Sequence, residues 1–588
     1  MARLEDAAST VRQRVFNRSL VRRSTYLFFS LSLLLAYILL MNLVSPRIYF
    51  AVRRVSFSEF FRLDWWLLPY LAVALAIPLL VSDCWRLAAA SLPVLAVMLF
   101  LDYFMQLTVS LCWILVTVFA LRKRLDLNKL RETLSILMLV FTGIIFAYLL
   151  IFPFLPFDTE PLDSATLTWV KLYATLQPFG VICYVLMPFG AFLPSYLQMI
   201  RRRSLSVTLV KNIVIREFLS RRLVKILFLL SLVFSVYLSA YSYFPKLNPG
   251  LGPTGVDIES YALILKNVDE AEDPVRFVFA NCSDRPLFYL FFHMLQKASG
   301  LPMLQILEFA PVFWLLGLTA SYYYLSSKLF DSGGLASLAA LLTLAGVQTT
   351  VGLYSSYQSN MVALIMMNIL AGIIISWREG FLKYVLVSTL SFLTPLIHPY
   401  TSVYYSAILG FTLLASFWRS RNIRHVNTLV VMLASALLSN VFTSYMASGQ
   451  GTPPLASAGR TAMRIVSFEN LFNFTSGTIY LFTSLYSSFI ANSIYLMLTL
   501  YGLANLLRLE IREESRLFML TSSFVLLPLY AMDGLMGSRL FFNFPSPVFS
   551  ALGAYLIKEK TLSILLIVLS LNFTLQAVYN LGVLSIPV

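Results

Sequence analysis

Acidic side chains gather in one polar stretch, from Gly252 to Pro286, that interrupts a chain otherwise rich in apolar residues. The stretch reads GPTGVDIESYALILKNVDEAEDPVRFVFANCSDRP, and its carboxylates belong to Asp257, Glu259, Asp269, Glu270, Glu272, Asp273 and Asp284. A carboxylate can act as a general base when it lies within hydrogen-bonding distance of the proton that it removes. If the protein catalyses a reaction, we expect its carboxylates to come from this stretch.

Asp257 is the first of these carboxylates and stands where a helix should begin, because a stretch rich in Gly and Pro precedes it. We expect the helix over Ile258–Val268, with Asp257 and Tyr261 on one face. Two roles stay open for this carboxylate, since Asp commonly serves only as a helix cap and can also act as a base. Glu259 is the second candidate base, and on a helix it points away from Asp257.

A histidine and an arginine are expected at the same membrane face as the acidic stretch. His398 ends an apolar segment in LTPLIHPYTSVYY, and Pro399 makes the chain turn there. A structural role at the helix end is the alternative for this histidine. Arg539, in MDGLMGSRLFFNFPSP, lies on the side of the membrane where arginine is disfavoured. Such a charge needs a partner, which is Asp533, a lipid headgroup or an anionic substrate.

Membrane helices must position these residues, because the composition excludes a soluble fold. Of the 588 residues, 59% are hydrophobic and only 12% are charged, whereas soluble proteins carry about 25% charged residues. Apolar stretches of about 20 residues, each long enough to cross the hydrocarbon core, recur along the chain. Basic cytoplasmic loops explain the net charge of +16, so this charge does not indicate nucleic-acid binding.

The basic loops predict about 17 spans and a cytoplasmic amino terminus, in an all-α, polytopic transmembrane fold. The expected spans cover residues 25–44, 65–82, 86–101, 104–121, 134–154, 170–198, 226–243, 303–328, 333–350, 353–376, 382–397, 399–418, 426–446, 478–506, 516–533, 540–557 and 561–582. The segment Pro286–Gly300 is too short and too polar for a span, so we expect it to lie along the outer surface as an in-plane helix.

Three regions follow from this arrangement. Residues 1–200 are expected to form an amino-terminal block of six membrane helices, whose role the sequence does not indicate. Residues 201–225 are basic and amphipathic and are expected to form an in-plane helix. Residues 226–588 form a second membrane block with two long external loops, 244–302 and 446–477.

The cysteines indicate neither a disulfide framework nor a zinc site. Cys84, Cys112, Cys183 and Cys282 are widely separated and show neither Cys-x-x-Cys nor His/Cys metal spacing. The sequence therefore indicates no cofactor, and it leaves a requirement for a divalent metal open.

Four segments of the second block share their order with a known superfamily. They read GVDIESYALI, DRPLFYLFFHMLQKASGLP, LIHPYTSVYY and SRLFFNFPSPVFSALGA. Through them, residues about 226–560 resemble the GT-C fold glycosyltransferases, which include the protein mannosyltransferases and the lipid A aminoarabinose transferases. In that family a first helix leads into a long external loop with a catalytic Asp near its start. The chain departs from the family pattern in having Asp-Ile-Glu in place of an adjacent acidic pair.

The resemblance implies a GT-C-like carboxy-terminal block that moves a sugar from a polyprenyl-phosphate carrier to an acceptor hydroxyl. The reaction would take place at the extracytoplasmic face of the cell membrane, among membrane lipids, and would invert the anomeric centre. The acceptor would be a glycan, a lipid or a protein. Asp257 would be the catalytic base, with Glu259 in reserve. The residues implied in substrate binding are Tyr261, Asp284, Arg285, His398, Tyr400 and Arg539.

Two other classes of protein stay open. A transporter or lipid flippase would need polar groups along a path across the membrane, and the scarcity of charged residues within the expected spans disfavours it. A polymerase or ligase of surface polysaccharide is the remaining class.

Overall fold

The computed structural model describes residues 127–155, 179–194, 213–248, 252–255, 257–282, 284–376, 379–447, 492–531 and 534–584. Within these residues the chain is helical apart from turns, coil and one pair of two-residue strands, which agrees with the expected all-α class. The expected spans between residues 25 and 121 and the external loop 446–477 lie almost wholly outside the described residues.

The chain forms two compact units, residues 1–176 with 557–572 and residues 177–556 with 573–588. The first unit contains α6 (Leu127–Ile151), η1 (Phe152–Phe154) and the first half of α26 (Lys560–Leu584) among its described elements. Within this unit Arg131 forms an ion pair with Glu559, with 2.7 Å between Nε and Oε2.

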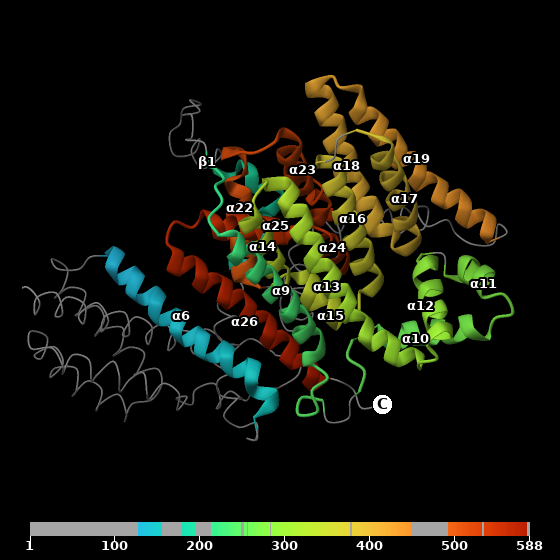
Figure 1. The fold of residues 1–588 in the computed structure, drawn as a ribbon, viewed down its shortest axis with the longest axis horizontal. Helices are drawn as coiled ribbons and strands as arrows, with labels where there is room; N and C mark the ends of the chain where they lie inside the picture. Colours follow the sequence, from blue (N-terminus) through green and yellow to red (C-terminus); the bar gives the residue numbers. More distant parts are fainter. Residues whose placement is uncertain are drawn as a thin grey trace, which may run out of the picture. The chain divides into compact units, whose positions relative to one another are not determined.

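The second unit contains the remaining elements and the second half of α26. In chain order they are η2 (Met187–Phe192), β1 (Ile213–Val214), α9 (Arg221–Tyr241), α10 (Ile258–Glu270), α11 (Pro274–Asn281), α12 (Pro286–Ser299), α13 (Met303–Phe330), α14 (Gly333–Thr343), α15 (Val347–Tyr354), α16 (Gln358–Ser376), α17 (Phe381–Ile397), α18 (Pro399–Ser420), α19 (Ile423–Met446), α22 (Ser493–Ala504), η4 (Leu506–Arg508), β2 (Leu509–Glu510), α23 (Glu513–Phe524), η5 (Leu527–Ala531), α24 (Gly534–Phe542) and α25 (Ser546–Leu556). Figure 1 shows the ribbon and labels most of these helices and β1.

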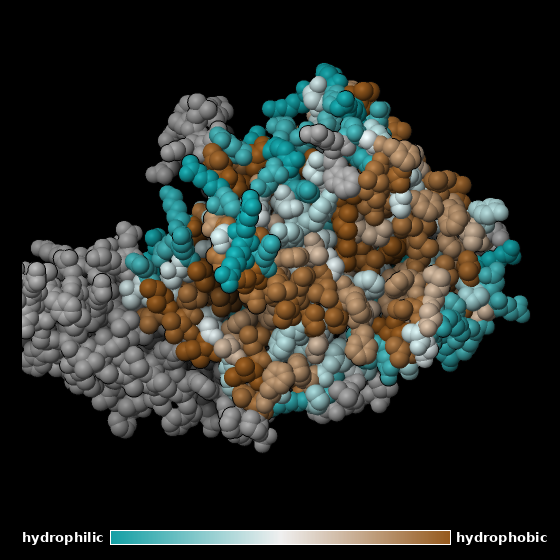
Figure 2. Space-filling view, in the orientation of Figure 1, coloured by the Kyte–Doolittle hydropathy of each residue, from teal (hydrophilic) through white to brown (hydrophobic). Residues whose placement is uncertain are grey.

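Eight helices in the described part of the chain are long and apolar enough to cross a membrane. They are Arg131–Phe154, Arg221–Tyr241, Met303–Phe330, Gly333–Leu353, Gln358–Ser376, Pro399–Ser420, Ile423–Met446 and Lys560–Val578. Figure 2 shows apolar side chains over the middle of the second unit, between hydrophilic side chains near the α18–α19 turn and others near α10 and α11. An apolar band between two polar ends is what a bilayer requires, so the chain is a multi-pass membrane protein.

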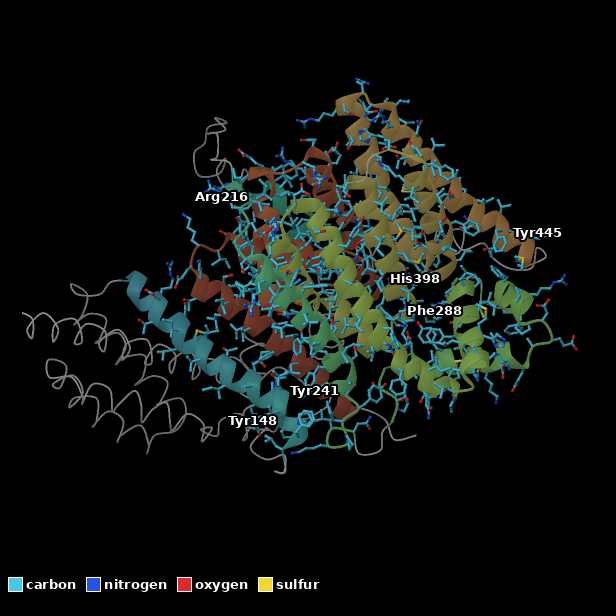
Figure 3. All side chains as sticks on the ribbon, viewed as in Figure 1. Tyr148, Arg216, Tyr241, Phe288, His398 and Tyr445 are labelled. Atoms are coloured by element: carbon cyan, nitrogen blue, oxygen red, sulfur yellow. The ribbon has the colours of Figure 1, made fainter. Side chains whose placement is uncertain are left out.

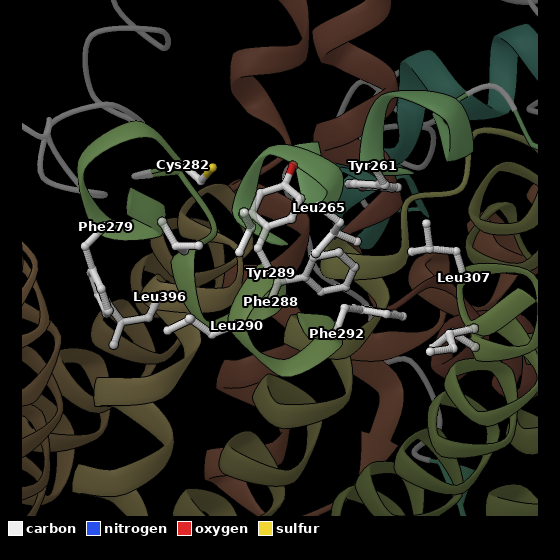
Figure 4. Close-up of a cluster of buried hydrophobic side chains, with 14 of the residues drawn as sticks. Tyr261, Leu265, Phe279, Cys282, Phe288, Tyr289, Leu290, Phe292, Leu307 and Leu396 are labelled. Atoms are coloured by element: carbon white, nitrogen blue, oxygen red, sulfur yellow. The ribbon is translucent and has the colours of Figure 1, made fainter. Parts of the chain in front are cut away.

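Three helices of the acidic stretch form a layer at one end of the second unit. Helix α10 begins at Ile258, as expected. The segment that we expected to form an in-plane helix is α12. This helix ends at Gly300, which has a left-handed φ of +68°. Together with α11 these helices bury one cluster of apolar side chains against α13, α17 and α19, which Figure 4 shows. Since Tyr261 and Phe288 belong to this cluster, its packing fixes the two helix starts that carry Asp257 and Arg285.

Basic loops lie at the opposite end of the same helices. Helix α13 starts beside the layer of α10–α12 and runs to Phe330, where Asp331 pairs with Arg512 at 3.1 Å between Oδ1 and Nη2. At the end of α18, Arg419 pairs with Glu513, with 2.8 Å between Nη1 and Oε1. The acidic stretch and these basic loops are therefore at opposite ends of the helices, as the charge pattern predicts.

The segment 201–225 differs from the in-plane helix that we expected. Residues 213 and 214 form β1, which pairs in parallel with β2, and α9 begins only at Arg221, capped by the Ser220 side chain. The extended segment between them is held by Glu217, whose carboxylate accepts hydrogen bonds from the backbone N–H groups of Gly333 and Gly334, each at 2.8 Å. Residues 201–212 lie outside the described residues. A carboxylate at the start of α14 satisfies N–H groups that a helix leaves unpaired.

The boundary between the units also differs from the one expected at residue 200. The apolar helix Phe179–Phe192 belongs to the second unit. Its carbonyl oxygens at Met187 and Pro188 accept hydrogen bonds from the Ser523 hydroxyl in α23, at 2.7 and 3.1 Å. A carbonyl-to-hydroxyl contact of this kind satisfies polar groups that lipid would leave unpaired.

Three segments expected as continuous spans are interrupted, and one of them is residues 516–533, where α23 ends at Phe524 and η5 begins at Leu527. Residues 333–350 divide into α14 and α15 at Gly346, and residues 540–557 divide into α24 and α25 at Pro545, which has no N–H for a helix ladder. At the break before α25, the buried Gln348 amide pairs two freed backbone groups. It donates to the carbonyl oxygens of Phe542 and Phe544 at 2.9 Å each. Breaks inside a membrane are tolerated when the protein itself pairs the freed groups.

Candidate functional site

Four charged or titratable side chains come together from four places in the second unit: Asp257, Arg285, His398 and Arg539. We call this set the polar cluster. Both guanidinium groups lie close enough to act on the carboxylate of Asp257 and on the imidazole of His398. Figure 3 shows His398 near the layer of α10–α12, where Phe288 is labelled. The structure thus brings together residues separated by as much as half the chain.

Helix starts bring three of these residues into the polar cluster. Asp257, Arg285 and His398 each directly precede the first residue of a helix, α10, α12 and α18. Pro286 and Pro399 start two of these helices, because proline fixes the φ angle that a helix needs and lacks the N–H that would stay unpaired. Helix α16 also begins here, since Ser359 in its first turn contacts Arg285.

Arg285 is already engaged by neighbouring side chains. Its Nη2 lies 2.8 Å from Oδ2 of Asp284, and its Nη1 donates to the Tyr261 hydroxyl at 2.9 Å and to the Ser359 hydroxyl at 3.4 Å. The guanidinium carbon also lies 5.6 Å from the centre of the Tyr261 ring, a favourable cation–π distance. Arg285 therefore links the starts of α12 and α16 to α10, with much of its charge offset by Asp284.

Asp257 is half-buried, and its carboxylate does not cap α10. Among the described residues this carboxylate has no hydrogen-bond or ion-pair partner. Burial raises the pKa of Asp257 above its usual range, while Arg285 and then Arg539 oppose the rise by favouring the charged form. Of the two roles left open by the sequence, the capping role is wrong, and the carboxylate is uncommitted.

Arg539 meets the polar cluster from α24. Its Nε lies 3.4 Å from the Tyr357 hydroxyl, and its guanidinium carbon lies 5.5 Å from the centre of that ring. Asp533, one of the partners considered for it, lies outside the described residues. A guanidinium held by an aromatic ring keeps its planar fork of donors for a carboxylate or a phosphate.

His398 is buried and held as an acceptor at Nδ1. The backbone N–H of Thr401 donates to Nδ1 at 3.3 Å, which caps α18 and leaves the ring proton on Nε2. Burial lowers the pKa of His398 well below its usual range, and Arg285 and Arg539 lower it further. The imidazole is therefore neutral at physiological pH and offers an N–H donor.

Three other residues named from the sequence have less central positions. Glu259 lies in the first turn of α10 and is exposed, so it points away from Asp257 as expected. The Tyr400 ring is half-buried, with its centre 5.8 Å from that of His398. Asp284 contacts the cluster only through Arg285.

Sequence reasoning missed several polar residues that hold the cluster. Beside His398 the buried Thr401 hydroxyl contacts the amide oxygens of Asn360 and Asn543, and Tyr357 contacts Arg539. Their signal in the sequence is weak, because Asn and Thr are common at helix ends and next to prolines.

Gly255 allows the loop before Asp257 to pass close to the turn between α15 and α16. Its φ of +124° is one that residues with a side chain rarely adopt. A Cβ there would lie 1.9 Å from the Ser356 hydroxyl oxygen and 3.3 Å from the Leu353 carbonyl oxygen. The glycine therefore sets how closely Asp257 approaches the start of α16.

We expect Gly255→Ala to lower stability by about 1–3 kcal/mol, because strain at φ and a close contact add, and to reduce activity through displacement of Asp257. Thermal melting in detergent measures the stability, and an activity assay measures the second effect. Gly300→Ala is the matched control, since Gly300 also has a positive φ, of +68°, but no atom within 4 Å of the added Cβ. Equal behaviour of the two variants would show that the approach of the loop does not matter.

Metal ligands do not gather at the polar cluster. Within the part of the chain that the structure describes, no group of three or more His, Cys, Asp and Glu side chains is arranged to hold a metal ion. Asp257 is the one carboxylate of the cluster, and Asp284 beside it is paired with Arg285.

Comparison of the chain with family models, curated proteins and solved structures finds no match. The GT-C resemblance therefore stays a prediction from the sequence. Any function must be supported by the geometry and chemistry of the polar cluster itself.

Proposed function

We propose that this protein is a membrane glycosyltransferase that moves a sugar from a polyprenyl-phosphate carrier to an acceptor hydroxyl at the extracytoplasmic face. The observation that carries the proposal is the uncommitted, half-buried carboxylate of Asp257 beside two guanidinium groups. A base, and a cation for a phosphate, are the two groups that this reaction needs. Their position at the end of the helices opposite the basic loops supports the outer face.

The proposed reaction is a single displacement. Asp257 accepts the proton of the acceptor hydroxyl while the hydroxyl oxygen forms a bond to the anomeric carbon. The bond between that carbon and the phosphate oxygen breaks, and its electron pair leaves with the lipid phosphate. Arg539 stabilises the charge on the leaving phosphate through its donor fork, and attack from the opposite side inverts the anomeric centre.

A transporter or flippase would use polar groups along a path across the membrane. The interrupted helices of the second unit are places where free carbonyl groups could line such a path. Three carbonyl groups at the breaks before α15 and α25 are paired by the protein, however, since Gln348 donates to those of Phe542 and Phe544 and Asn492 donates to that of Ala345 at 3.0 Å. This observation favours chemistry at one face over transport.

The test uses purified protein in lipid bilayers and a panel of polyprenyl-phosphate sugars, with release of the sugar from the lipid as the readout. Release from at least one donor, lost in Asp257→Asn, is the expected result. A protein that releases no sugar from any donor, yet moves lipid or solute across the bilayer, would overturn the proposal in favour of the transporter class.

The side of the membrane is tested by labelling engineered cysteines with a membrane-impermeant maleimide. Native Cys282 is a poor probe, because it is only 7% exposed and burial raises its pKa to about 11. We expect an exposed cysteine in Glu270→Cys to react in intact cells, and one in Arg424→Cys, at the basic end, to react only after the membrane is opened. The reverse pattern would put the carboxylates in the cytoplasm, and the lipid-donor proposal would fail.

A further inference from the structure

Thr401 lies at the centre of a buried hydrogen-bonded network behind the polar cluster. Its side chain is 0% exposed, and its hydroxyl oxygen lies 2.8 Å from Nδ1 of His398 and 2.9 Å from Oδ1 of Asn543. The same hydroxyl contacts Oδ1 of Asn360 in the first turn of α16. One hydroxyl therefore joins the starts of α16 and α18 to the end of α24.

The contact with His398 bears on how the imidazole is oriented. The Thr401 backbone N–H donates to Nδ1, which favours an unprotonated nitrogen there, and the Thr401 hydroxyl oxygen lies 2.8 Å from the same nitrogen. The hydroxyl has one proton, so it donates to Nδ1 or to an Asn Oδ1 and not to both at once. With Nδ1 as an acceptor, the proton stays on Nε2, the other ring nitrogen. A ring held in this way cannot rotate without losing both contacts.

The contact with Asn543 bears on Arg539. The Asn543 amide nitrogen donates to the backbone carbonyl oxygen of Arg539 at 2.9 Å, and its amide oxygen faces Thr401. Helix α24 has nine residues and ends at the break before Pro545, so little of its own ladder holds this end. Asn543 is 2% exposed, and from outside α24 the Thr401 hydroxyl holds its amide oxygen.

We propose that Thr401 is a positioning residue, whose hydroxyl sets the orientation of the His398 ring and, through Asn543, the position of Arg539 relative to Asp257. The proposal rests on the proposed function for the reaction that these groups serve. Misplacing a reacting or binding group by about 1 Å can lower a rate about 100-fold, so a hydroxyl that touches no substrate can still control the chemistry.

The first test compares substitutions that differ only in the hydroxyl. Thr401→Val keeps the shape and removes the hydroxyl, and Thr401→Ser keeps the hydroxyl. Thr412→Val is the matched control, because Thr412 lies on the same helix, is 2% exposed and bonds through its hydroxyl to Ile408 and Thr521. We expect Thr401→Val to lower kcat/KM for the lipid donor about 10–100-fold, and Thr401→Ser and Thr412→Val to stay close to wild type.

Thermal melting shows whether the two Val variants are equally folded. Equal loss of activity in Thr401→Val and Thr412→Val would overturn the proposal. Activity in Thr401→Ser as low as in Thr401→Val would also overturn it. Combination with Arg539→Ala sharpens the result, since a residue that acts partly through Arg539 must lose part of its effect once that guanidinium is gone. If the effects of Thr401→Val and Arg539→Ala on kcat/KM are fully additive, Thr401 does not act through Arg539, and that part of the proposal is wrong.

The second test does not depend on the reaction. The chain has only three histidines, so nitrogen-15 labelling of histidine, with His293→Gln and His425→Gln for assignment, isolates the His398 ring by NMR. We expect a neutral ring with its proton on Nε2 in the wild type and in Thr412→Val, and shifted ring resonances in Thr401→Val. An unchanged His398 signal in Thr401→Val would overturn the proposal. A wild type that transfers no sugar would overturn the proposed function and leave this result to stand.

Discussion

Sugar transfer by Asp257→Asn is expected to fall about 100-fold or more, the range in which general-base catalysis contributes. Asn keeps the shape of Asp but cannot accept the proton of the acceptor hydroxyl. Because the Asp257 carboxylate neither caps α10 nor pairs with another described residue, its loss should leave melting temperature close to that of the wild type. Turnover of a polyprenyl-phosphate sugar and thermal melting, measured on the same preparation, check both statements.

Glu259→Gln is the matched control for this substitution. Glu259 lies two residues further along α10 and is exposed, so the same change from carboxylate to amide should leave turnover unchanged. Near-normal turnover in Asp257→Asn, or equal loss in both variants, would end the assignment of Asp257 as the base.

The pH dependence of turnover gives a further check on Asp257. A base works only when deprotonated, so turnover must fall as the pH falls through the pKa of Asp257. Burial raises this pKa, and the acid limb should therefore lie above the pH of about 4 at which an ordinary aspartate titrates. Arg285 and Arg539 oppose the rise, so removing the charge of Arg539 should move the limb to still higher pH.

Arg539→Ala is expected to weaken binding of the lipid phosphate about 10–100-fold, because a hydrogen-bonded ion pair contributes about 1.5–3 kcal/mol. Arg539→Lys should have an intermediate effect, since an ammonium keeps the charge but loses the planar fork. Arg539→Lys should also leave unchanged the pH at which turnover falls on the acid side, whereas Arg539→Ala should raise that pH. Binding of polyprenyl phosphate, which needs no turnover, measures the affinities.

Arg276→Ala controls for the loss of any positive charge near the same face. Arg276 lies on α11 with an exposed side chain and pairs with Asp273 at 3.5 Å, so its removal should leave affinity for the phosphate unchanged. Affinities equal to wild type in both Arg539 variants would make Arg539 a structural residue, such as a partner of Asp533.

Helix existence could be predicted from the sequence, but helix continuity could not. The apolar runs and basic loops predicted α9, α13 and α16–α19 close to their observed bounds. The breaks before α15 and α25 were missed, because Gly346 and Pro545 stand within runs apolar enough for one span. Such a break is stable because a side chain distant in sequence pairs the freed backbone groups, as Gln348 does at the break before α25. No local sequence pattern reveals which side chain does this.

The residues of the polar cluster could be predicted from the sequence, but the hydrogen bonds between them could not. Asp257, His398 and Arg539 were singled out because the sequence placed them at the expected outer face, and Arg285 was implied by the family resemblance. The structure brings all four together. The pairing of Arg285 with Tyr261 and Ser359, and of Asn543 with Thr401, depends on contacts between helices. Such contacts follow from tertiary packing, which a single sequence does not encode at the level of pairs.

The way helices begin at the polar cluster has an electrostatic consequence. Helices α10, α12, α16 and α18 all start there, and each helix start carries about half a positive elementary charge from its aligned peptide dipoles. The backbone itself thus creates a positive potential that no side-chain substitution removes. An anionic headgroup would be attracted even without the Arg539 side chain, so we expect Arg539→Ala to lose only part of its affinity for the lipid phosphate. Salt should screen the remaining affinity only weakly, because the site is partly buried.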